Sequence, residues 1–482
     1  MKNTNLLVIM SDEHDPRWMG CSGNTLVQTP NLDRLAARGT RFSDAYTTSP
    51  VCVPARAAFA TGRYIHQIGF WDNADAYEGS VPSWHHRVRD AGHRVVSVGK
   101  LHFRGLPGDD HGFSEEIIPM NVFEGRGDLY GLLRGDDMPP RTDGKKMAGL
   151  AGPGESEYTW YDREITARAQ VWMREEAPKH ADRPWVLYVS LVAPHFPLKA
   201  PPHWYYRYFG RTPPPKLYGP QARWRHPAAR DQGENTGYDS YFDAAAVQRA
   251  RAGYLGLVSS LDENIGHLLE TLADCGLGDN TRVLYTSDHG DNLGARGLWG
   301  KQTMYQEAAA VPLILAGPGV PEGTVRTLPV SQIDVFPTVL ECVGVDGDTG
   351  EGVSLFRLAA GEVPQRHVLS EYHGMSSKSA EYMIRHGRWK YVYYVQYPDQ
   401  PELYDLEADP EELRDLGTDP AQRGVVAECE AILRAMLDPE AVDARAKKRQ
   451  AELIAAAGGR EKVAKIGGFG YSPPPGYKPD FT

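Results

Sequence analysis

Cys52, in the stretch Cys52-Val53-Pro54-Ala55-Arg56, is a candidate nucleophile. Proline is favoured at the first position of a helix, and the small residues of 55–60 predict a short helix that Gly62 ends. Cys52 would then lie at the positive end of the helix dipole, with Arg56 on the same face. A nucleophile, a guanidinium and free backbone N–H groups together suit the binding of a tetrahedral oxyanion.

Cys52 also has an ordinary interpretation. Most free cysteines are buried and behave as small hydrophobic residues, and a lone Cys-x-Pro-x-Arg pattern is too short to exclude that role. Other polar groups of the chain favour the chemical interpretation, because they follow segments that read as strands.

Four apolar runs, each typical of a strand buried on both faces, end in polar side chains. The runs cover residues 6–10, 95–98, 185–192 and 283–286. The polar groups that follow them are Asp12 with Glu13, Lys100 with His102, His195, and Asp288 with His289. If the four strands are parallel, these groups meet at one edge of the sheet, where α/β folds bind ligands.

These residues divide by the chemistry that each could do. The candidate metal ligands, a set that suits Ca²⁺, Mg²⁺ or Mn²⁺ better than zinc, are Asp12, Asp288 and His289. The candidate cations for an oxyanion are Arg56, Lys100 and Lys301. The candidate acid and base near neutral pH are His102 and His195. Each alone could be a helix cap or an ordinary histidine, but their joint occurrence with Cys52 argues against coincidence.

The motifs of the chain, taken in order, resemble those of type I sulfatases, in the alkaline phosphatase superfamily. Cys52-Val53-Pro54-Ala55-Arg56 followed by Thr61-Gly62-Arg63 resembles the family's signature. The other matching stretches are Ile9-Met10-Ser11-Asp12, Thr29-Pro30-Asn31-Leu32-Asp33, Gly99-Lys100-Leu101-His102, Ala193-Pro194-His195, Ser287-Asp288-His289-Gly290-Asp291, Gly297-Leu298-Trp299-Gly300-Lys301, and Leu403-Tyr404-Asp405-Leu406 with Asp409-Pro410. The stretches most similar to choline sulfatases are Trp71-Asp72-Asn73, Lys100-Leu101-His102-Phe103 and His111-Gly112-Phe113.

The resemblance implies a modified residue and a metal. Cys52 would be oxidised to formylglycine by a formylglycine-generating enzyme, and the hydrate of the aldehyde, a gem-diol, would be the nucleophile. One divalent cation would be held by Asp12, Asp288, His289 and the modified Cys52, and would lower the pKa of the gem-diol. Many members carry Asp or Gln where this chain has Glu13, which would either reach the metal or face away. The imidazole, a softer donor, favours Mn²⁺ over Ca²⁺.

The resemblance also implies roles for the remaining groups. Arg56 and Lys100 would neutralise the oxyanion. His195, with Lys301, would protonate the leaving alkoxide, and His102 would then take a proton from the second hydroxyl to expel sulfate. The residue expected to hydrogen-bond the substrate or the gem-diol is Asn73.

Three functions follow from this resemblance and from the residues. The first is hydrolysis of a small sulfate ester, such as choline sulfate or an aryl sulfate. The second is a phosphonate monoester hydrolase or phosphodiesterase on the same scaffold, and the third is a catalytically silent binding protein. The complete set of polar groups argues against the third. Aromatic residues of 201–210 could line a pocket for a quaternary ammonium, or could be core residues or subunit contacts.

Composition excludes some partners. The chain has 482 residues and a net charge of -11, which argues against nucleic acid or an anionic membrane surface as a partner. No apolar stretch approaches the ~18 residues of a membrane span, and the run 6–10 is too short for a signal peptide, so we expect a cytoplasmic protein. The five cysteines are odd in number and scattered, which argues against a disulfide framework.

The pattern of segments predicts an α/β fold with two domains. Residues 1–365 would form a catalytic domain, a large mixed and mostly parallel sheet sandwiched by helices. Short strands after the boundary predict a smaller antiparallel sheet within 366–482. Residues 104–160 are rich in Gly, Pro and charge, which predicts long functional or mobile loops. A helix over 331–343 would be interrupted at Pro337, and the tail from Gly458 would lie on the surface or at the interface of a homo-oligomer.

Overall fold

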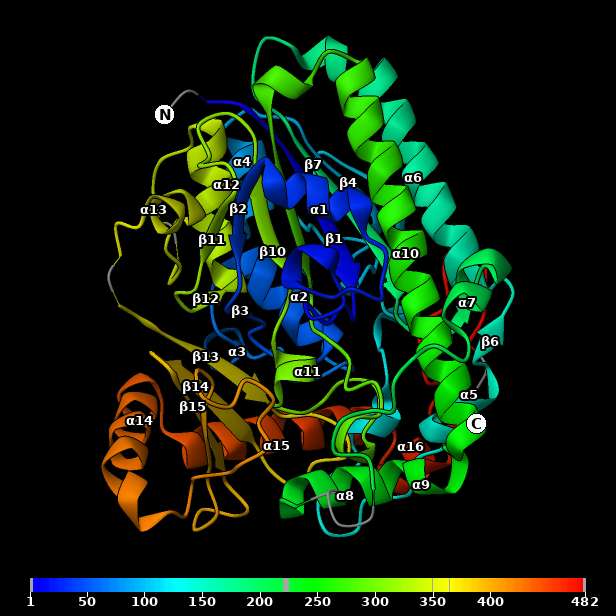
Figure 1. The fold of residues 1–482 in the computed structure, drawn as a ribbon, viewed down its shortest axis with the longest axis vertical. Coiled ribbons are helices and arrows are strands. Elements are labelled where there is room, and N and C mark those ends of the chain that lie inside the picture. Colours follow the sequence, from blue (N-terminus) through cyan, green and yellow to red (C-terminus); the bar gives the residue numbers. More distant parts are fainter. Residues whose placement is uncertain (1–2, 220–224, 349, 364, 480–482) are drawn as a thin grey trace.

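The computed structural model describes residues 3–219, 225–348, 350–363 and 365–479, and its centre is one eight-stranded sheet (Figure 1). In their order across the sheet, the strands are β11 (Thr324–Arg326), β2 (Gly39–Phe42), β10 (Leu313–Ala316), β9 (Thr281–Ser287), β1 (Asn5–Asp12), β7 (Val186–Pro194), β4 (Val95–Lys100) and β5 (Glu115–Met120). The five strands from β9 to β5 are parallel, and β10 is antiparallel to both of its neighbours. The predicted mixed, mostly parallel sheet is confirmed.

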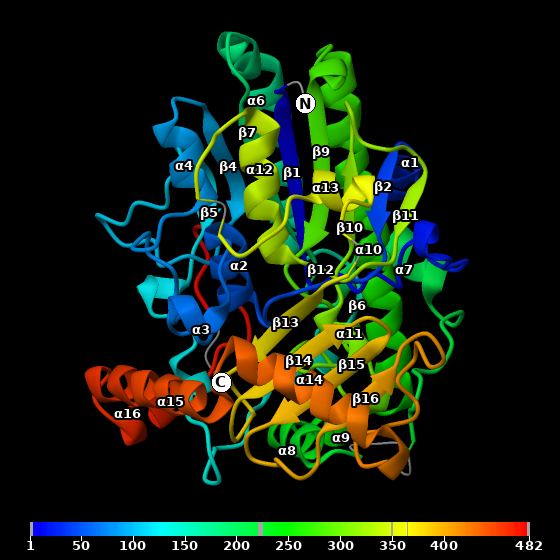
Figure 2. The ribbon, with the colours of Figure 1, turned by 90° about the vertical axis from the view of Figure 1, so that its left-hand side faces the viewer.

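Helices cover both faces of this sheet (Figure 2), and the core clusters to which the β1 side chains belong identify the helices on each face. Leu7 and Ile9 belong to one core cluster with residues of α1 (Pro30–Ala37), α6 (Glu157–Glu175) and α10 (Ala244–Asp274). Leu6, Val8 and Met10 belong to the opposite cluster with α2 (Cys52–Thr61), α4 (Trp84–Asp90) and α12 (Val335–Val343). Because successive side chains of a strand point to opposite faces, a fully apolar run such as β1 requires both layers.

A second sheet follows in the C-terminal part of the chain. It is antiparallel, with the strands β13 (His367–Tyr372), β14 (Glu381–His386), β15 (Trp389–Tyr394) and β16 (Glu402–Asp405) in sequence order. One helix, α14 (Arg423–Met436), packs on it through Cys429 and Leu433, and α15 (Pro439–Ala456) follows. The predicted small antiparallel sheet is confirmed, and the division of the chain at residue 365 stays a prediction.

Short elements connect these layers and build the surroundings of the site. The remaining helices are α3 (Ile65–Ile68), α5 (Asp143–Gly149), α7 (Pro202–Tyr208), α8 (Pro227–Thr236), α9 (Tyr238–Tyr241), α11 (Gln306–Ala309), α13 (Leu355–Ala360) and α16 (Arg460–Ile466). The remaining strands are β3 (Ala45–Tyr46), β6 (Gly152–Pro153), β8 (Lys199–Ala200) and β12 (Val330–Ser331). The segment 104–160, expected as long loops, contains β5, α5 and the start of α6.

Two prolines occupy other positions than the sequence suggested. Helix α2 begins at Cys52 itself, so Pro54 is its third residue and not its first. Helix α12 begins at Val335, so Pro337 lies in its first turn and does not interrupt it. The first turn of a helix has no intrahelical acceptor for its N–H groups, so a proline there costs no hydrogen bond.

Gly62 ends α2 as predicted, with a left-handed φ of 66° and its N–H donated to the carbonyl of Ala58. All five cysteines are free. Across the residues that the structure describes, no helix is long and apolar enough to cross a bilayer.

Candidate active site

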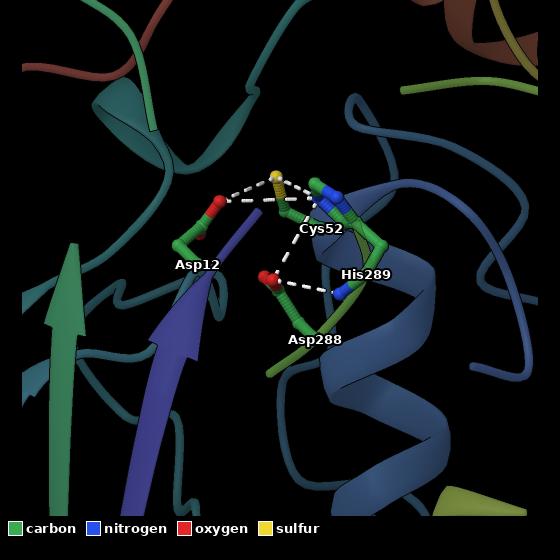
Figure 3. Close-up of side chains that lie close together, drawn as sticks. All are labelled: Asp12, Cys52, Asp288 and His289. Carbon is green, nitrogen blue, oxygen red and sulfur yellow. Dashed lines mark hydrogen bonds and ion pairs between the residues drawn. The ribbon is translucent and has the colours of Figure 1, made fainter. Parts of the chain in front are cut away.

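The carboxyl ends of the parallel strands bring the predicted polar groups to one edge of the large sheet. Asp12 ends β1 and Lys100 ends β4, while His195 follows β7 and Asp288 follows β9. Residue Cys52, the first of α2, reaches the same edge from the side (Figure 3). The sheet therefore positions the polar groups, and one helix N-terminus positions the thiol.

Four side chains at this edge form a buried cluster of potential metal ligands, Asp12, Cys52, Asp288 and His289 (Figure 3). Their ligand atoms all lie within 4.8 Å of one another. His289 Nε2 lies 3.2 Å from Cys52 Sγ, 3.9 Å from Asp12 Oδ1 and 3.7 Å from Asp288 Oδ1. The arrangement is a compact pocket of acceptor atoms.

The donor set fits a divalent cation. His289 Nδ1 lies 3.0 Å from the carbonyl oxygen of Gly290, which leaves the Nε2 lone pair to the cluster when Nδ1 donates its proton there. Burial opposes ionisation of Asp12, but Lys100 and the other nearby cations outweigh it and hold the pKa of that carboxyl well below its usual value. An ionised carboxylate, a second aspartate and one imidazole suit Ca²⁺, Mg²⁺ or Mn²⁺.

Two buried cations orient the aspartates. Arg56, 1% exposed, donates from Nε to Asp288 Oδ2 at 2.8 Å and from Nη2 to Asp12 Oδ2 at 3.1 Å. Lys100 Nζ lies 2.5 Å from the same oxygen of Asp12. Ser190 Oγ accepts from Arg56 Nη1 at 2.8 Å, so the guanidinium is held on three sides. The Oδ2 atoms face these cations, and the Oδ1 atoms of both aspartates lie on the side of His289.

The thiol of Cys52 is neutral near pH 7. Burial, with a further contribution from Asp12, raises its pKa to about 12, although Lys301 Nζ lies 3.0 Å from Sγ. The thiolate is the reactive form of cysteine, so the N-terminus of α2 does not by itself make this side chain a nucleophile.

Lys301 and His195 form a hydrogen-bonded pair beside Cys52. Lys301 Nζ lies 2.8 Å from His195 Nε2, and His195 Nδ1 lies 2.6 Å from the carbonyl oxygen of Phe196. An ammonium can only donate, so Nε2 accepts and Nδ1 carries the imidazole proton. Burial first, and then Lys301, lower the pKa of His195 well below its usual value, which makes the imidazole neutral.

Glu13 lies with this pair and not with the four-residue cluster. Its Oε2 is 3.5 Å from His195 Nε2 and 3.7 Å from Lys301 Nζ. Both carboxylate oxygens are buried without a hydrogen bond from any described residue, and burial raises the pKa of Glu13 to about 8. Ligand atoms of Glu13, Asp12 and His195 lie within 4.8 Å of one another, but Glu13 does not belong to the set that contains Asp288 and His289.

The ring nitrogens of His102 form no hydrogen bond with any described residue. His102 is 4% exposed. Burial, followed by Lys100, lowers the pKa of His102 well below its usual value. A neutral imidazole with an unused lone pair is suited to accept a proton.

Asn73 supports the helix that carries Cys52. Its Oδ1 accepts from the backbone N–H of Val53 at 3.1 Å, which satisfies one of the free donors in the first turn of α2. Asn73 also lines the cavity above Cys52. The sequence predicted a contact with the substrate or gem-diol and missed this contact with the helix.

The aromatic stretch 201–210 is not part of this cavity. Tyr205 and Tyr208 are buried on α7, which packs against α10, and the Tyr208 hydroxyl lies 2.6 Å from Ser259 Oγ. Of the alternatives open for this stretch, the core holds for these two tyrosines, and none of the residues 201–210 lines this cavity.

Residues from three other segments line the cavity, and the sequence did not single them out individually. They are Asp128, Arg141, Asp143, Tyr238, Phe469 and Tyr471. The first three lie within 104–160, the segment whose composition predicted functional loops. The last two belong to the C-terminal tail, in which no periodicity or spacing marks them.

The tail closes one side of the cavity instead of lying apart from it. Tyr158 donates its hydroxyl to the carbonyl of Ser472 at 2.6 Å, and its ring meets Tyr471 edge-on with centroids 5.2 Å apart. The same Tyr158 ring lies 5.7 Å from His195, and Tyr471 contacts Phe196. A role of the tail in an oligomer stays a prediction.

Comparison with protein families gives two matches. A family described as Sulfatase matches residues 4–345. A second family, described as N-sulphoglucosamine sulphohydrolase, C-terminal, matches residues 294–438.

Curated relatives and solved structures are similar over most of the chain. A choline-sulfatase of Rhizobium meliloti is 33% identical and covers 93% of this chain and 89% of its own length. Arylsulfatase K of Danio rerio is 28% identical, with 90% and 84% covered. The structure of phosphonate monoester hydrolase of Agrobacterium radiobacter has a TM-score of 0.72 at 21% identity, covering 90% of this chain and 96% of that one. A protein solved with its substrate D-glucosamine-2-N,6-O-disulfate has a TM-score of 0.72 at 24% identity, covering 90% of this chain and 97% of that one; both structures show the shared fold.

Proposed function

The chain belongs to the sulfatase family and is a sulfuric ester hydrolase, and we propose that it hydrolyses a small sulfate ester with residue 52 as formylglycine beside one divalent cation. The observation that carries the proposal is the position of Cys52. Its Sγ lies 3.2 Å from His289 Nε2 and 3.0 Å from Lys301 Nζ, between the metal-ligand cluster and the candidate proton donor.

Maturation would require a formylglycine-generating enzyme that acts on Cys52. The conversion replaces the thiol by an aldehyde, and its hydrate supplies the attacking oxygen. The sulfur atom in the structure stands in for that oxygen.

The metal would be held by Asp12, Asp288 and His289 together with residue 52. When bound, the cation polarises a sulfate oxygen and lowers the pKa of a hydroxyl next to it. Arg56 keeps both aspartates in place through Oδ2, and Lys100 adds positive charge at the same side. These two buried cations cannot move far, so they are preorganised for a sulfate group. Mn²⁺ is favoured over Ca²⁺ by the imidazole ligand.

Protons are moved by the side chains on either side of residue 52. Lys301 Nζ donates to the oxygen of the leaving alcohol, and His195 Nε2, its hydrogen-bond acceptor, steers the ammonium. His102, whose nitrogens are unused by described residues, takes the proton of a hydroxyl at residue 52. An acid and a base on separate side chains allow both halves of the reaction to proceed near neutral pH.

The identity of the alcohol is the finer part of the proposal. The relative named choline-sulfatase and the aromatic residues Phe196, Tyr238 and Tyr471 around the cavity support choline sulfate as one candidate. An aryl sulfate is another. If choline is the alcohol, choline sulfate should be turned over far better than an uncharged alkyl sulfate of similar size, and equal turnover would remove choline from consideration.

The experiment is a side-by-side measurement of kcat/KM for an aryl sulfate, choline sulfate and an aryl phosphonate monoester. Mass spectrometry of the Cys52 peptide accompanies it. We expect sulfate esters to be preferred and the peptide mass to show conversion of thiol to aldehyde. A dominant phosphonate activity would favour the alternative of a phosphonate monoester hydrolase, and an unmodified thiol in fully active protein would contradict the mechanism.

A further inference from the structure

The cavity that contains Cys52 and Lys301 is also lined by two charged residues of the 104–160 segment, Arg141 and Asp128, here called the distal pair. The Arg141 side chain is 4% exposed and that of Asp128 11%. Arg141 Nη2 donates to Asp128 Oδ2 at 2.8 Å, and Arg141 Nε donates to Asp143 Oδ2 at 2.5 Å. Two carboxylates therefore fix the plane of the guanidinium.

Each member of the distal pair keeps one polar atom unused. Arg141 Nη1 and Asp128 Oδ1 are both buried, and neither has a hydrogen-bond partner among the residues that the structure describes. Buried polar atoms without a partner are rare in folded proteins and are costly, so each needs an explanation. In this cavity the other such atoms belong to Glu13 and His102, which are groups of the reaction centre.

We propose that the distal pair binds hydroxyl groups of the leaving alcohol, so that the substrate is the sulfate ester of a polyhydroxylated alcohol of the glycerol or sugar type. The proposal rests on the proposed sulfatase function. Arg141 Nη1 offers a proton and Asp128 Oδ1 accepts one, and adjacent hydroxyls can satisfy both at once.

Other alcohols fit the distal pair less well. A quaternary ammonium and an unsubstituted phenyl ring have neither a donor nor an acceptor, so they would leave Nη1 and Oδ1 unpaired. An alcohol with a carboxylate or second sulfate would meet Asp128 and Asp143, whose two negative charges exceed the one charge of Arg141. The rings of Phe196 and Tyr471, 5.6 Å apart and nearly perpendicular, add apolar surface for carbon-bound hydrogens.

The test uses the metal-loaded protein with converted residue 52. We compare kcat/KM for glycerol monosulfate with propyl sulfate, and for a glucose monosulfate with cyclohexylmethyl sulfate. The hydroxylated ester of at least one pair should be preferred by about 10- to 100-fold, the range expected for hydrogen bonds to charged groups. Which pair shows the preference distinguishes a glycerol-type from a sugar-type substrate.

A substitution then assigns the preference to the distal pair. Asp128→Asn can still accept from Arg141 Nη2, but presents a donor where Oδ1 was an acceptor. We expect the preference ratio to fall to within about threefold, mainly through KM of the hydroxylated ester. The control is Asp109→Asn, a 4% exposed aspartate that pairs with Arg104 and does not line the cavity; its ratio should be unchanged.

A measurement on the unaltered protein covers the case in which Asp128→Asn does not fold. Free glycerol or free glucose, according to the preferred ester, should inhibit at a concentration at least about tenfold lower than propanol or cyclohexylmethanol. Equal inhibition, or equal turnover of both esters in each pair, overturns the inference. The same holds for a choline sulfate preference over both hydroxylated esters.

Failure of the proposed function has a different signature. In that case the converted, metal-loaded protein would turn over none of the sulfate esters, including the aryl sulfate. Turnover of aryl, propyl and hydroxylated esters at similar rates would leave the sulfatase function intact and reject only the role of the distal pair.

Discussion

Two groups of mostly buried charged side chains differ in how many of their polar atoms form hydrogen bonds. The first is the reaction centre at the edge of the large sheet. The second, here called the seam network, joins the region after β1 to the C-terminal sheet and consists of Arg17, Arg296, Glu307, Lys390 and Glu412. Its ion pairs are Arg17 with Glu307 at 3.0 Å, Arg296 with Glu307 at 3.0 Å and Lys390 with Glu412 at 2.5 Å.

Among the residues that the structure describes, every buried polar atom of the seam network has a partner, whereas several buried polar atoms of the reaction centre have none. In the seam network, none of the five side chains has a buried polar atom without a partner, counting the residues that the structure describes. In the reaction centre, both carboxylate oxygens of Glu13 and both ring nitrogens of His102 lack a hydrogen bond to any residue that the structure describes. Charged groups whose hydrogen bonds are all made within the protein stabilise the contact between two parts of the fold. Charged or polar groups with unpaired atoms can form their remaining hydrogen bonds with a ligand.

The largest effect is expected at residue 52. Cys52→Ala should lower kcat/KM for an aryl sulfate by at least about 10⁴-fold, because it removes the nucleophile, while the free energy of unfolding changes by only about 1 kcal/mol. Metal should still bind through Asp12, Asp288 and His289. The matched control is Cys342→Ala, which truncates another fully buried cysteine and should leave activity unchanged. Retained activity in Cys52→Ala would show that residue 52 is not the nucleophile of the reaction centre.

The next largest difference is expected between substitutions of two buried lysines, one in each region. Lys390→Met should destabilise the protein by about 3–5 kcal/mol, because Glu412 loses its 2.5 Å partner in a buried site. Lys301→Met should change the free energy of unfolding by less than about 1.5 kcal/mol, because its nearest carboxylate, Glu13, is 3.7 Å away. It should lower kcat for an alkyl sulfate by about 10²–10³-fold.

Denaturant unfolding and kinetics on the same samples test this pair. The specific activity of folded Lys390→Met should equal that of the unaltered protein. Equal destabilisation by both substitutions would show that the reaction centre is as fully satisfied as the seam network.

Chelation should act on the reaction centre alone. A cation present at about 100 times its Kd stabilises the folded state by about 2.7 kcal/mol, so a chelator should lower Tm and abolish activity together. The loss should be the same in the Lys390→Met protein, because the two regions share none of these ion pairs. Mn²⁺ should restore Tm and activity better than Ca²⁺, and an unchanged Tm after complete metal removal would contradict the site.

The smallest effect is a change in acid stability from the seam network. Burial opposes ionisation of Glu307, but Arg17 and Arg296 outweigh it and hold its pKa at about 2, below the ordinary value of 4.5. Its stabilisation is therefore present above about pH 4.5 and is lost as the pH falls toward 2. Glu307→Gln should flatten the stability curve in this window by up to about 1.4 kcal/mol per pH unit. Unfolding curves at several pH values measure it, and an unchanged acid slope would contradict the assignment.

The centre of the site was predictable because buried parallel strands have a plain sequence pattern. The apolar runs before Asp12, Lys100, His195 and Asp288 each end where the chain meets the sheet edge. That pattern fixes the sheet and the polar groups, and a helix with Gly62 as its end fixes Cys52. The exact start of α2 was missed, because a proline is tolerated at several positions of a first turn.

The walls of the site were not predictable from local patterns. Arg141 and Asp128 belong to a segment without periodicity, and their pairing depends on how that segment folds over the sheet edge. Phe469 and Tyr471 are brought to the cavity by tertiary contacts, since the Phe469 ring packs against Phe123 and the Tyr471 ring against Tyr158. Conversely, the aromatic run of α7 could have lined a pocket, but Tyr205 and Tyr208 are core residues and Tyr206 is 62% exposed, because composition alone does not say which face of a helix is covered.

The closing of the cavity by the C-terminal tail has a consequence for the time course of biosynthesis. Cys52 is 1% exposed in the folded chain, and it is synthesised well before Phe469 and Tyr471, which follow it by more than 400 residues. At synthesis rates of about 5–20 residues per second, this interval lasts on the order of tens of seconds. During that time this wall of the cavity is absent, and residue 52 would be accessible to the formylglycine-generating enzyme of the proposed mechanism. The order of residues along the chain would thus give the proposed conversion a kinetic window before the cavity closes.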